Sequence, residues 1–160
     1  MVDLKPSPLA GQVVLITGAE SGIGRETALR AASAGADIAA VGLDSSGLDS
    51  LVEQVRAVGR RVAARQADVS DTDAFTAAVD ELVGELGSLR VAHANAGVLT
   101  PATTLIDLDL DEWNRILAVN LTGVLITFRA SVHISQPKVD SSSRPARRSP
   151  CVPEPDCWPT

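Results

Sequence analysis

The sequence contains no tyrosine, and its aromatic side chains are only two tryptophans and two phenylalanines. Cysteine is equally scarce, because both thiols, Cys151 and Cys157, lie in the last ten residues. The body of the chain therefore has no cysteine for a disulfide framework or a structural zinc site. The N-terminal stretch MVDLKPSPLAGQ lacks the apolar segment of a signal peptide, and no apolar run approaches the roughly 18 residues of a membrane span. We expect a cytoplasmic protein without a metal site or a membrane partner.

An excess of positive charge is also missing. The formal net charge is -6, and acidic residues outnumber basic ones by 20 to 14. Such a balance gives no reason to expect binding to nucleic acid or to an anionic membrane. The 160 residues suffice for about one domain, and the 45% hydrophobic content suffices for a core.

Short apolar runs alternate with helical patterns over the first 136 residues. The runs predict strands, and residues spaced by three and four predict the helices between them. Ser70 and Asp73 resemble a capping box at the start of the third helix. This alternation indicates βαβ units and a parallel sheet, and therefore an α/β fold. The strands are expected at 12–17, 37–42, 61–66 and 89–94, and the helices at 22–34, 46–58, 71–86 and 110–133.

The composition changes abruptly at Pro137. Residues 137–160 contain six of the nine prolines, together with clustered serine and arginine, and show no apolar periodicity. A segment of this kind cannot bury enough apolar surface to offset the entropy of ordering. The sequence therefore predicts a folded unit over residues 1–136 and a disordered tail over 137–160.

A glycine-rich stretch, TGAESGIG at 17–24, directly follows the first apolar strand. Gly18 can adopt the positive φ of a sharp turn, Gly22 lets backbone approach a phosphate, and Gly24 permits close contact between helix and strand. Together with Ser21 and Ile23, these residues present the free N–H groups of a helix N-terminus to an anion. The alternative is a tight strand–helix turn that holds no ligand.

The spacing T-G-x-x-x-G-I-G resembles the dinucleotide loop of the short-chain dehydrogenase/reductase family. Three further motifs of that family follow in the same order. Ala94 departs from the pattern, because a second asparagine is common there. The resemblance covers about residues 10–135, and the motifs that carry it after the loop are Asp68-Val69, Asn95-Ala96-Gly97 and Asn120.

The resemblance implies the N-terminal portion of a Rossmann-like domain with strand order 3-2-1-4, and an NAD(P)-dependent oxidoreductase that acts on alcohol or carbonyl groups. It implies that Asp68 and Val69 contact the adenine. The alternative for Asp68 is that its side chain caps the turn before the next helix.

For Asn120 the resemblance implies a helix distortion that holds a water of a proton relay, which is compatible with the weak helix former Gly123. The alternative for Asn120 is a buried amide in a packing hydrogen bond or a helix cap. Asn95 is expected to link the strand end to its neighbours, and Gly97 to leave room for the cofactor.

The choice of dinucleotide depends on charge beside the adenosine ribose. Asp44 stands about 20 residues after the loop, where an acid holds the ribose hydroxyls and repels a 2′-phosphate. Members of the family that prefer NAD usually place this acid at the strand tip, which here is Gly42. Members that prefer NADP often have a basic residue at the position of Ser21 or Leu43, and here neither residue is basic. Glu20 adds negative charge to the loop. NAD is therefore favoured over NADP, and the alternative for Asp44 is the N-cap region of the next helix.

The resemblance ends before the residues that perform the family's catalysis. Family members carry a serine after a fifth strand and then Tyr-x-x-x-Lys, whereas this chain has no tyrosine and Ser141–Ser143 lie in Pro/Arg-rich sequence. We expect a truncated dinucleotide-binding fragment without turnover, in which Asn120 is an accessory residue only. The alternatives are a non-catalytic partner that joins a homo- or hetero-oligomer through helix 110–133, and an unstable product without function.

Overall fold

Four parallel strands form the centre of the fold, in the order β3-β2-β1-β4. The computed structural model describes residues 7–99, 104 and 106–135. The predicted α/β class and the strand order 3-2-1-4 are both confirmed. The strands are β1 (Val13–Thr17), β2 (Asp37–Gly42), β3 (Val62–Gln66) and β4 (Leu89–His93), and the helices are α1 (Gly22–Ser33), α2 (Ser45–Ala57), α3 (Thr72–Leu86), α4 (Leu110–Leu117), the π-helix η1 (Ala118–Thr122) and α5 (Gly123–Ser135).

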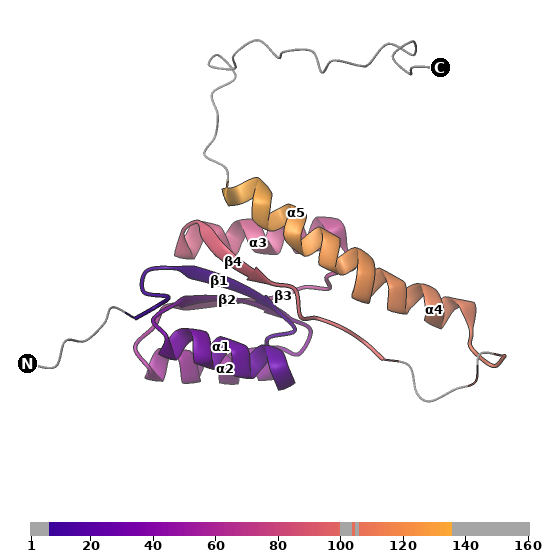
Figure 1. Cartoon of the computed structure of the whole chain (residues 1–160), viewed down its shortest axis with the longest axis horizontal. Helices are drawn as coiled ribbons and strands as arrows, with labels where there is room; N and C mark the ends of the chain where they lie inside the picture. The colour runs from indigo at the N-terminus through magenta and orange to yellow at the C-terminus, as the bar shows by residue number, and fades with distance from the viewer. Residues whose placement is uncertain (1–6, 100–103, 105, 136–160) are drawn as a thin grey trace, which may run out of the picture.

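Helices cover both faces of the sheet. In Figure 1, α1 and α2 lie against one face, and α3 and α5 lie against the other. Every residue of β1 and β2 is buried, which explains why these strands are apolar without alternation. The two layers leave the carboxyl ends of the strands at one edge, from which the loops to α1, α2, α3 and α4 emerge.

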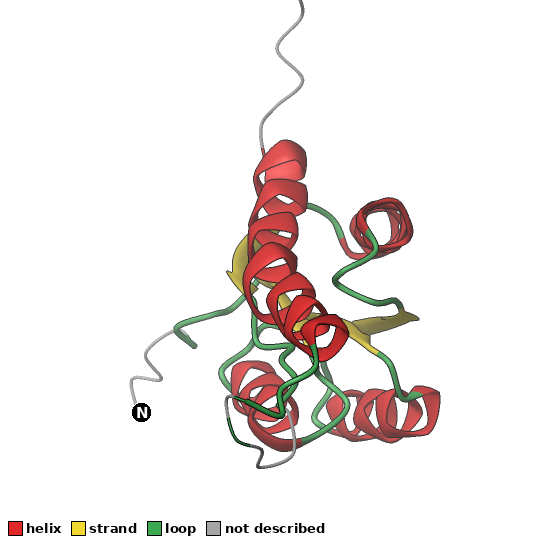
Figure 2. Cartoon of the chain, turned by 90° about the vertical axis from the view of Figure 1, so that its right-hand side faces the viewer, coloured by secondary structure: helices red, strands yellow, loops and turns green. Residues whose placement is uncertain are grey.

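The helix expected at 110–133 is one rod with a defect. Figures 1 and 2 show α4 and α5 continuing into each other, and the five residues of η1 join them. The face of α5 that carries Ile126, Thr127 and Ala130 is buried, and this helix packs against α3 and β4. The opposite face of the rod is exposed.

The same rod is long and apolar enough to cross a membrane, judged by length and composition alone. The qualifying stretch is Leu110–Val132, so the expectation that no run reaches this length was wrong. Arg115, Asn120 and Arg129 interrupt this stretch, so the sequence shows no continuous apolar run across it. A core helix of a soluble protein passes the same test, so the finding is weak evidence for a span.

The start of α3 also differs from the expectation. The N-cap is Asp71, whose side chain accepts a hydrogen bond from the Ala74 N–H at 3.0 Å. The predicted capping box of Ser70 and Asp73 is therefore wrong, since Ser70 instead donates to Asp68, two residues earlier. The predicted tail at 137–160, with Cys151 and Cys157, lies outside the described residues.

Candidate functional site

A cavity of about 500 Å³ opens at the carboxyl ends of the strands. It lies where β1 is flanked by β2 on one side and β4 on the other, the point at which the strand order reverses. Open α/β sheets bind their ligands at this switch point. The lining residues are Gly18, Glu20–Ile23, Val41–Leu43, Ala67–Ser70, Asn95–Val98, Arg115 and Val119.

The glycine loop shapes one wall of this cavity. Gly18 and Gly22 have φ of 64° and 52°, in the left-handed region that glycine tolerates best. A Cβ at Gly22 would meet no atom within 4 Å, so the backbone there faces open space. Ser21 is the N-cap of α1 and its side chain makes no capping hydrogen bond, and the Ile23 side chain is 74% exposed. The first N–H groups of α1, which have no partner within the helix, are left for a ligand.

Gly24 lies beneath the loop rather than on the cavity wall. A Cβ there would overlap the Gly18 carbonyl oxygen and stand 2.6 Å from Asn95 Nδ2. The predicted close contact of helix and strand at Gly24 is therefore present.

A buried threonine ties the loop to the end of β4. The Thr17 hydroxyl accepts hydrogen bonds from the backbone N–H groups of Asn95 and Ala96, both at 3.0 Å. In return, Asn95 Nδ2 donates to the carbonyls of Thr17 at 3.0 Å and Gly18 at 3.3 Å. Asn95 thus has the linking position expected of it, whereas Thr17 was missed as a site residue. A threonine at a strand end, next to the glycine motif, was the available signal.

Asp68 and Val69 form the wall above β3. Asp68 Oδ1 accepts from the N–H of Ser70 at 2.8 Å and from its hydroxyl at 2.7 Å, which closes a short turn before α3. The capping alternative for Asp68 is therefore present in the structure. A carboxylate has about four acceptor positions, so Asp68 Oδ2 can still accept a hydrogen bond. Asp68 lines the cavity, so a ligand there could donate that bond.

Asn120 lies in the middle of η1, so the helix distortion expected around it is confirmed. Its amide is exposed rather than buried, which corrects one premise of the alternative interpretation. Asn120 Oδ1 accepts from the Val98 N–H, and Nδ2 donates to the Val98 carbonyl, both at 2.8 Å. This contact holds the segment that follows Gly97 against the π-helix.

Asp44 caps α2 instead of lining the cavity. Its carboxylate accepts from the Ser46 N–H at 3.0 Å and from the Ser46 hydroxyl at 2.8 Å. The hydroxyl bond is the main reason why the pKa of Asp44 lies below its ordinary value. The N-cap alternative is thus realised, and the carboxylate that contacts the tip of β2 is that of Glu20, whose Oε1 accepts from the Leu43 N–H at 3.1 Å.

Arg115 is the single lysine or arginine on the described wall of the cavity. Its Nε and Nη2 both donate to Glu112 at 2.8 Å, which raises the pKa of the guanidinium and lowers that of the carboxyl. Within the residues that the structure describes, no group of three or more His, Cys, Asp or Glu could hold a metal ion.

The fold and this cavity together define a Rossmann-like dinucleotide-binding domain. A family model described as short chain dehydrogenase matches residues 12–138. The chain therefore belongs to the short-chain dehydrogenase family.

Individual relatives agree with this assignment. A cyclohexanol dehydrogenase from Rhodococcus sp. (strain TK6) is 40% identical over 138 residues, covering 77% of this chain and 51% of its own. A (-)-trans-carveol dehydrogenase from Rhodococcus erythropolis is 35% identical, covering 76% and 48%. The chain thus spans about half the length of the curated relatives it matches.

Solved structures give the same result. The carveol dehydrogenase from Mycobacterium avium in complex with NAD is 36% identical, with a TM-score of 0.76 and coverage of 79% of this chain and 50% of that one. A short chain dehydrogenase from Mycobacterium paratuberculosis bound to NAD is 35% identical, with a TM-score of 0.75 and coverage of 79% and 51%.

Proposed function

We propose that this chain binds a nicotinamide adenine dinucleotide in the cavity at the carboxyl ends of the strands. The observation that carries the proposal is the bare backbone at Gly22, which faces open space at the N-terminus of α1. There the helix dipole and free N–H groups attract the pyrophosphate. The adenine would lie beside Asp68 and Val69, and the segment from Asn95 to Gly97 would border the rest of the cofactor.

We propose NAD rather than NADP as the preferred dinucleotide. Among the described residues, the cavity wall near the tip of β2 carries Glu20 and no basic side chain, and Arg115 is already paired with Glu112. A 2′-phosphate would bring about two negative charges to this wall, as phosphate esters do. The solved relatives from the two mycobacteria are bound to NAD, which agrees with this preference.

The oxidoreductase chemistry of the family needs groups beyond the cofactor site. Hydride transfer to a carbonyl requires a proton donor at the developing alkoxide, and the family uses a tyrosine supported by a lysine, whereas this chain has no tyrosine. Losing a general acid–base group costs about 10²–10⁴ in rate. We therefore propose a dinucleotide-binding protein of the alcohol dehydrogenase and carbonyl reductase type that shows no turnover as the 160-residue chain.

Two titrations and one assay test this function. Calorimetry should give similar affinities for NAD and ADP-ribose, within about threefold, because the contacts identified belong to the adenosine and pyrophosphate halves. A broad panel of alcohols and carbonyls should give no change at the reduced-nicotinamide absorbance band. Failure to bind either ligand would refute the binding function. Sustained turnover would refute only the proposal that the chain is catalytically inactive.

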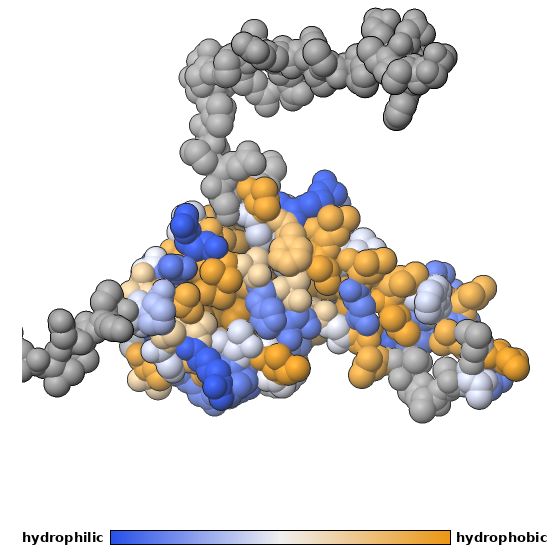
Figure 3. Space-filling model, viewed as in Figure 1, coloured by the Kyte–Doolittle hydropathy of each residue, from blue (hydrophilic) through white to orange (hydrophobic). Residues whose placement is uncertain are grey.

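The apolar outer face of α4, η1 and α5 favours a second candidate function, that of an oligomerisation partner. Figure 3 shows hydrophobic residues gathered over these helices. Large exposed apolar patches mark association sites. We propose that this face binds a second copy or a full-length homologue rather than a membrane or nucleic acid, and that the protein acts in the cytoplasm. The exposed residues are Leu110, Trp113, Leu121, Leu125, Phe128 and Val132.

A matched pair of substitutions tests the association. Val132 on α5 and Val58 at the end of α2 are 57% and 50% exposed. Val132→Glu should shift the sedimentation of the protein towards monomer, whereas Val58→Glu should leave it unchanged. An unchanged monomer in all three proteins would remove this candidate, and the absence of a cooperative melting transition would favour an unstable product instead.

A further inference from the structure

Glu20 lies at the tip of β2 although it belongs to the loop after β1. Its Oε1 accepts from the Leu43 N–H at 3.1 Å, one residue beyond the last residue of β2. In Rossmann-like domains an acid at this place, reached from the second strand, binds the ribose 2′-hydroxyl of NAD. The carboxylate of Glu20 therefore reaches the same strand tip from the glycine loop.

Gly42, the last residue of β2, makes room for that carboxylate. A Cβ built on Gly42 would overlap Glu20 Oε2 and stand 2.6 Å from Glu20 Cδ. The φ of Gly42 is not in the left-handed region, so the backbone itself would accept any side chain. The Glu20 carboxylate can therefore occupy this place only because Gly42 has no side chain.

The Glu20 carboxylate has unused acceptor capacity. Its Oε2 is buried and accepts no hydrogen bond from any residue that the structure describes. A buried polar atom without a partner costs free energy that a suitable donor recovers. The terminal torsion of glutamate is soft, so a small rotation turns an oxygen towards a hydroxyl in the cavity that Glu20 lines.

Arg25, in the first turn of α1, is an arginine near the loop, and its guanidinium is already paired. Arg25 donates to the carbonyls of Glu20 at 3.3 Å and Gly47 at 3.1 Å, and to the Ser50 hydroxyl at 2.8 Å. Its guanidinium therefore fixes the loop backbone against α2 and does not line the cavity. Among the described residues that line the cavity, Glu20 is the charged side chain at the tip of β2, whereas Asp44 caps α2 outside the lining.

We infer that Glu20 is the residue that selects NAD over NADP in this chain, by accepting hydrogen bonds from the adenosine ribose and by repelling a 2′-phosphate. This inference rests on the proposed dinucleotide binding and assigns its specificity to one side chain. The strand-tip acid typical of such domains is replaced by an acid from the glycine loop, with Gly42 as the compensating change.

Substitution of the charge alone tests the inference. The unaltered chain should bind NAD at least about tenfold more tightly than NADP, since like charges at close range in a partly desolvated site repel strongly. Glu20→Gln keeps the shape, removes the charge and should reduce this NAD-to-NADP affinity ratio about tenfold or more. Glu26→Gln is the matched control, because Glu26 is an exposed carboxylate on α1 outside the cavity, and it should leave the ratio unchanged.

Transfer of the acid to the strand tip makes the test reciprocal. Glu20→Ala should lose discrimination, and the double variant Glu20→Ala with Gly42→Asp should regain it, because the new carboxylate fills the vacated place. Thermal melting of each variant verifies that it is folded.

The outcomes separate this inference from the function on which it rests. No binding of either dinucleotide by the unaltered chain would overturn both. Binding of NAD with a ratio that Glu20→Gln changes no more than Glu26→Gln does would overturn the specificity role of Glu20 and leave dinucleotide binding intact. A ratio that falls in Glu20→Gln and returns in the double variant supports the inference.

Discussion

At the scale of single residues, a few polar side chains hold together the strand ends that frame the cavity. The Thr17 side chain accepts two backbone N–H groups with one oxygen, and the residue is only 1% exposed. Removing an acceptor from a buried donor costs more than the hydrogen bond itself contributes, because the donor is left without water. The geometry of the β4 end therefore depends on one hydroxyl of β1.

Thr17→Val should lower the free energy of unfolding by about 1–3 kcal/mol, because two N–H groups lose their acceptor. Thr127→Val is a matched control, since Thr127 is equally buried but its hydroxyl only donates to the Gly123 carbonyl within α5. Urea denaturation measures both variants. Equal losses would show that the bridge from β1 to β4 adds nothing beyond burial of a threonine.

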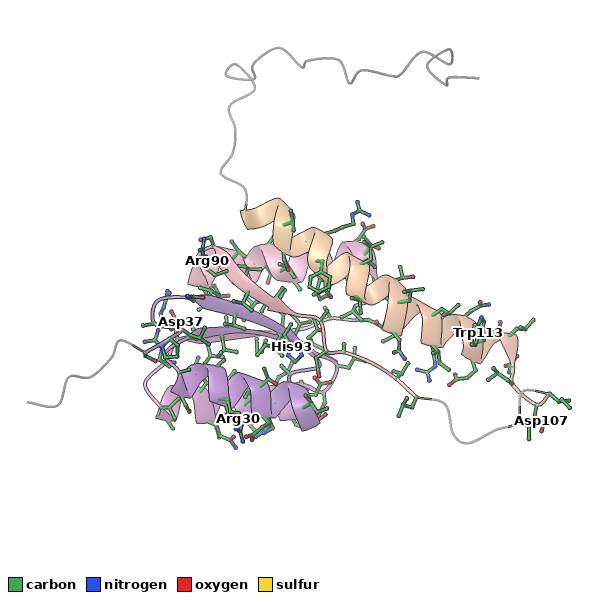
Figure 4. All side chains as sticks on the ribbon, viewed as in Figure 1. Arg30, Asp37, Arg90, His93, Asp107 and Trp113 are labelled. Carbon is green, nitrogen blue, oxygen red and sulfur yellow. The ribbon has the colours of Figure 1, made fainter. Side chains whose placement is uncertain are left out.

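A second polar cluster lies at the opposite end of the sheet. Figure 4 labels Asp37 at the amino-terminal end of β2, where its carboxylate accepts from Arg60 Nη2 at 2.5 Å and from Arg61 Nε at 2.8 Å. Burial favours the neutral acid, but the hydrogen bonds from Arg61 and the charge of Arg60 prevail and hold the pKa of Asp37 below its ordinary value. The ion pairs therefore stabilise the folded state while Asp37 is charged.

This cluster predicts a pH dependence of stability. A carboxyl with a lowered folded-state pKa contributes stability above the unfolded value of about 3.9, and the contribution is lost as the pH falls through the folded value. Asp37→Asn should reduce the free energy of unfolding by about 1–3 kcal/mol at pH 6, and the difference from the unaltered protein should shrink below about pH 4. Asp80→Asn, on the exposed face of α3, is the control. A difference that stays constant down to pH 2 would contradict the ion-pair account.

At the scale of elements, the π-helix η1 is the feature that shapes the site most. It brings Asn120 to the backbone of Val98, and it is followed by Gly123, where a Cβ would stand 2.7 Å from Val69 Cγ2. A π-bulge inside a longer helix often accompanies a functional position. The close approach of α5 to the loop between β3 and α3 thus favours a glycine at this position.

Gly123→Ala should destabilise the protein by about 1–3 kcal/mol, because overpacking outweighs the better helix propensity of alanine. Val69→Ala removes the opposing methyl groups. In the Val69→Ala background, adding Gly123→Ala should therefore cost much less stability than it does in the unaltered chain. A double-mutant cycle by thermal or urea unfolding measures this coupling. Additive effects would mean that the two residues do not compete for the same space.

The regular elements were predictable from the sequence because burial leaves a period in it. The strands and helices were expected within one residue of their observed bounds in most cases, since buried β1 and the stripe of α3 leave unambiguous patterns. The break at η1 was foreseen from the resemblance around Asn120, not from periodicity. The cap of α3 was misassigned because Ser70, Asp71 and Asp73 offer competing side chains, and only the backbone decides among them.

At the scale of the whole molecule, the site is assembled from segments that are distant in sequence. The Thr17–Asn95 bridge spans 78 residues, and the contact of Glu20 with Leu43 spans 23. A motif predicts which residues meet at one cavity, as it did for Gly18, Gly22 and Asn95. It does not reveal that Asp44 turns to cap α2 or that Glu20 takes the place at the tip of β2, because these depend on side-chain directions set by the packed sheet.

The proposed dinucleotide site places the pyrophosphate against the backbone of Gly22. Gly22→Val places a side chain in the space proposed for the pyrophosphate, but it also strains a backbone with φ of 52°. Gly59→Val is the matched control, because Gly59 has φ of 77°, also has open space around its Cβ position, and lies at the end of α2 away from the cavity. Both variants should lose about 1 kcal/mol or more of stability to the same backbone strain.

Calorimetric titration of NAD into the unaltered chain and these two variants, at a temperature where all three are folded, is the most direct measurement. We expect heat of binding for the unaltered chain and for Gly59→Val, and none for Gly22→Val. Equal NAD affinity in all three proteins would contradict the proposed site and place the ligand away from the glycine loop.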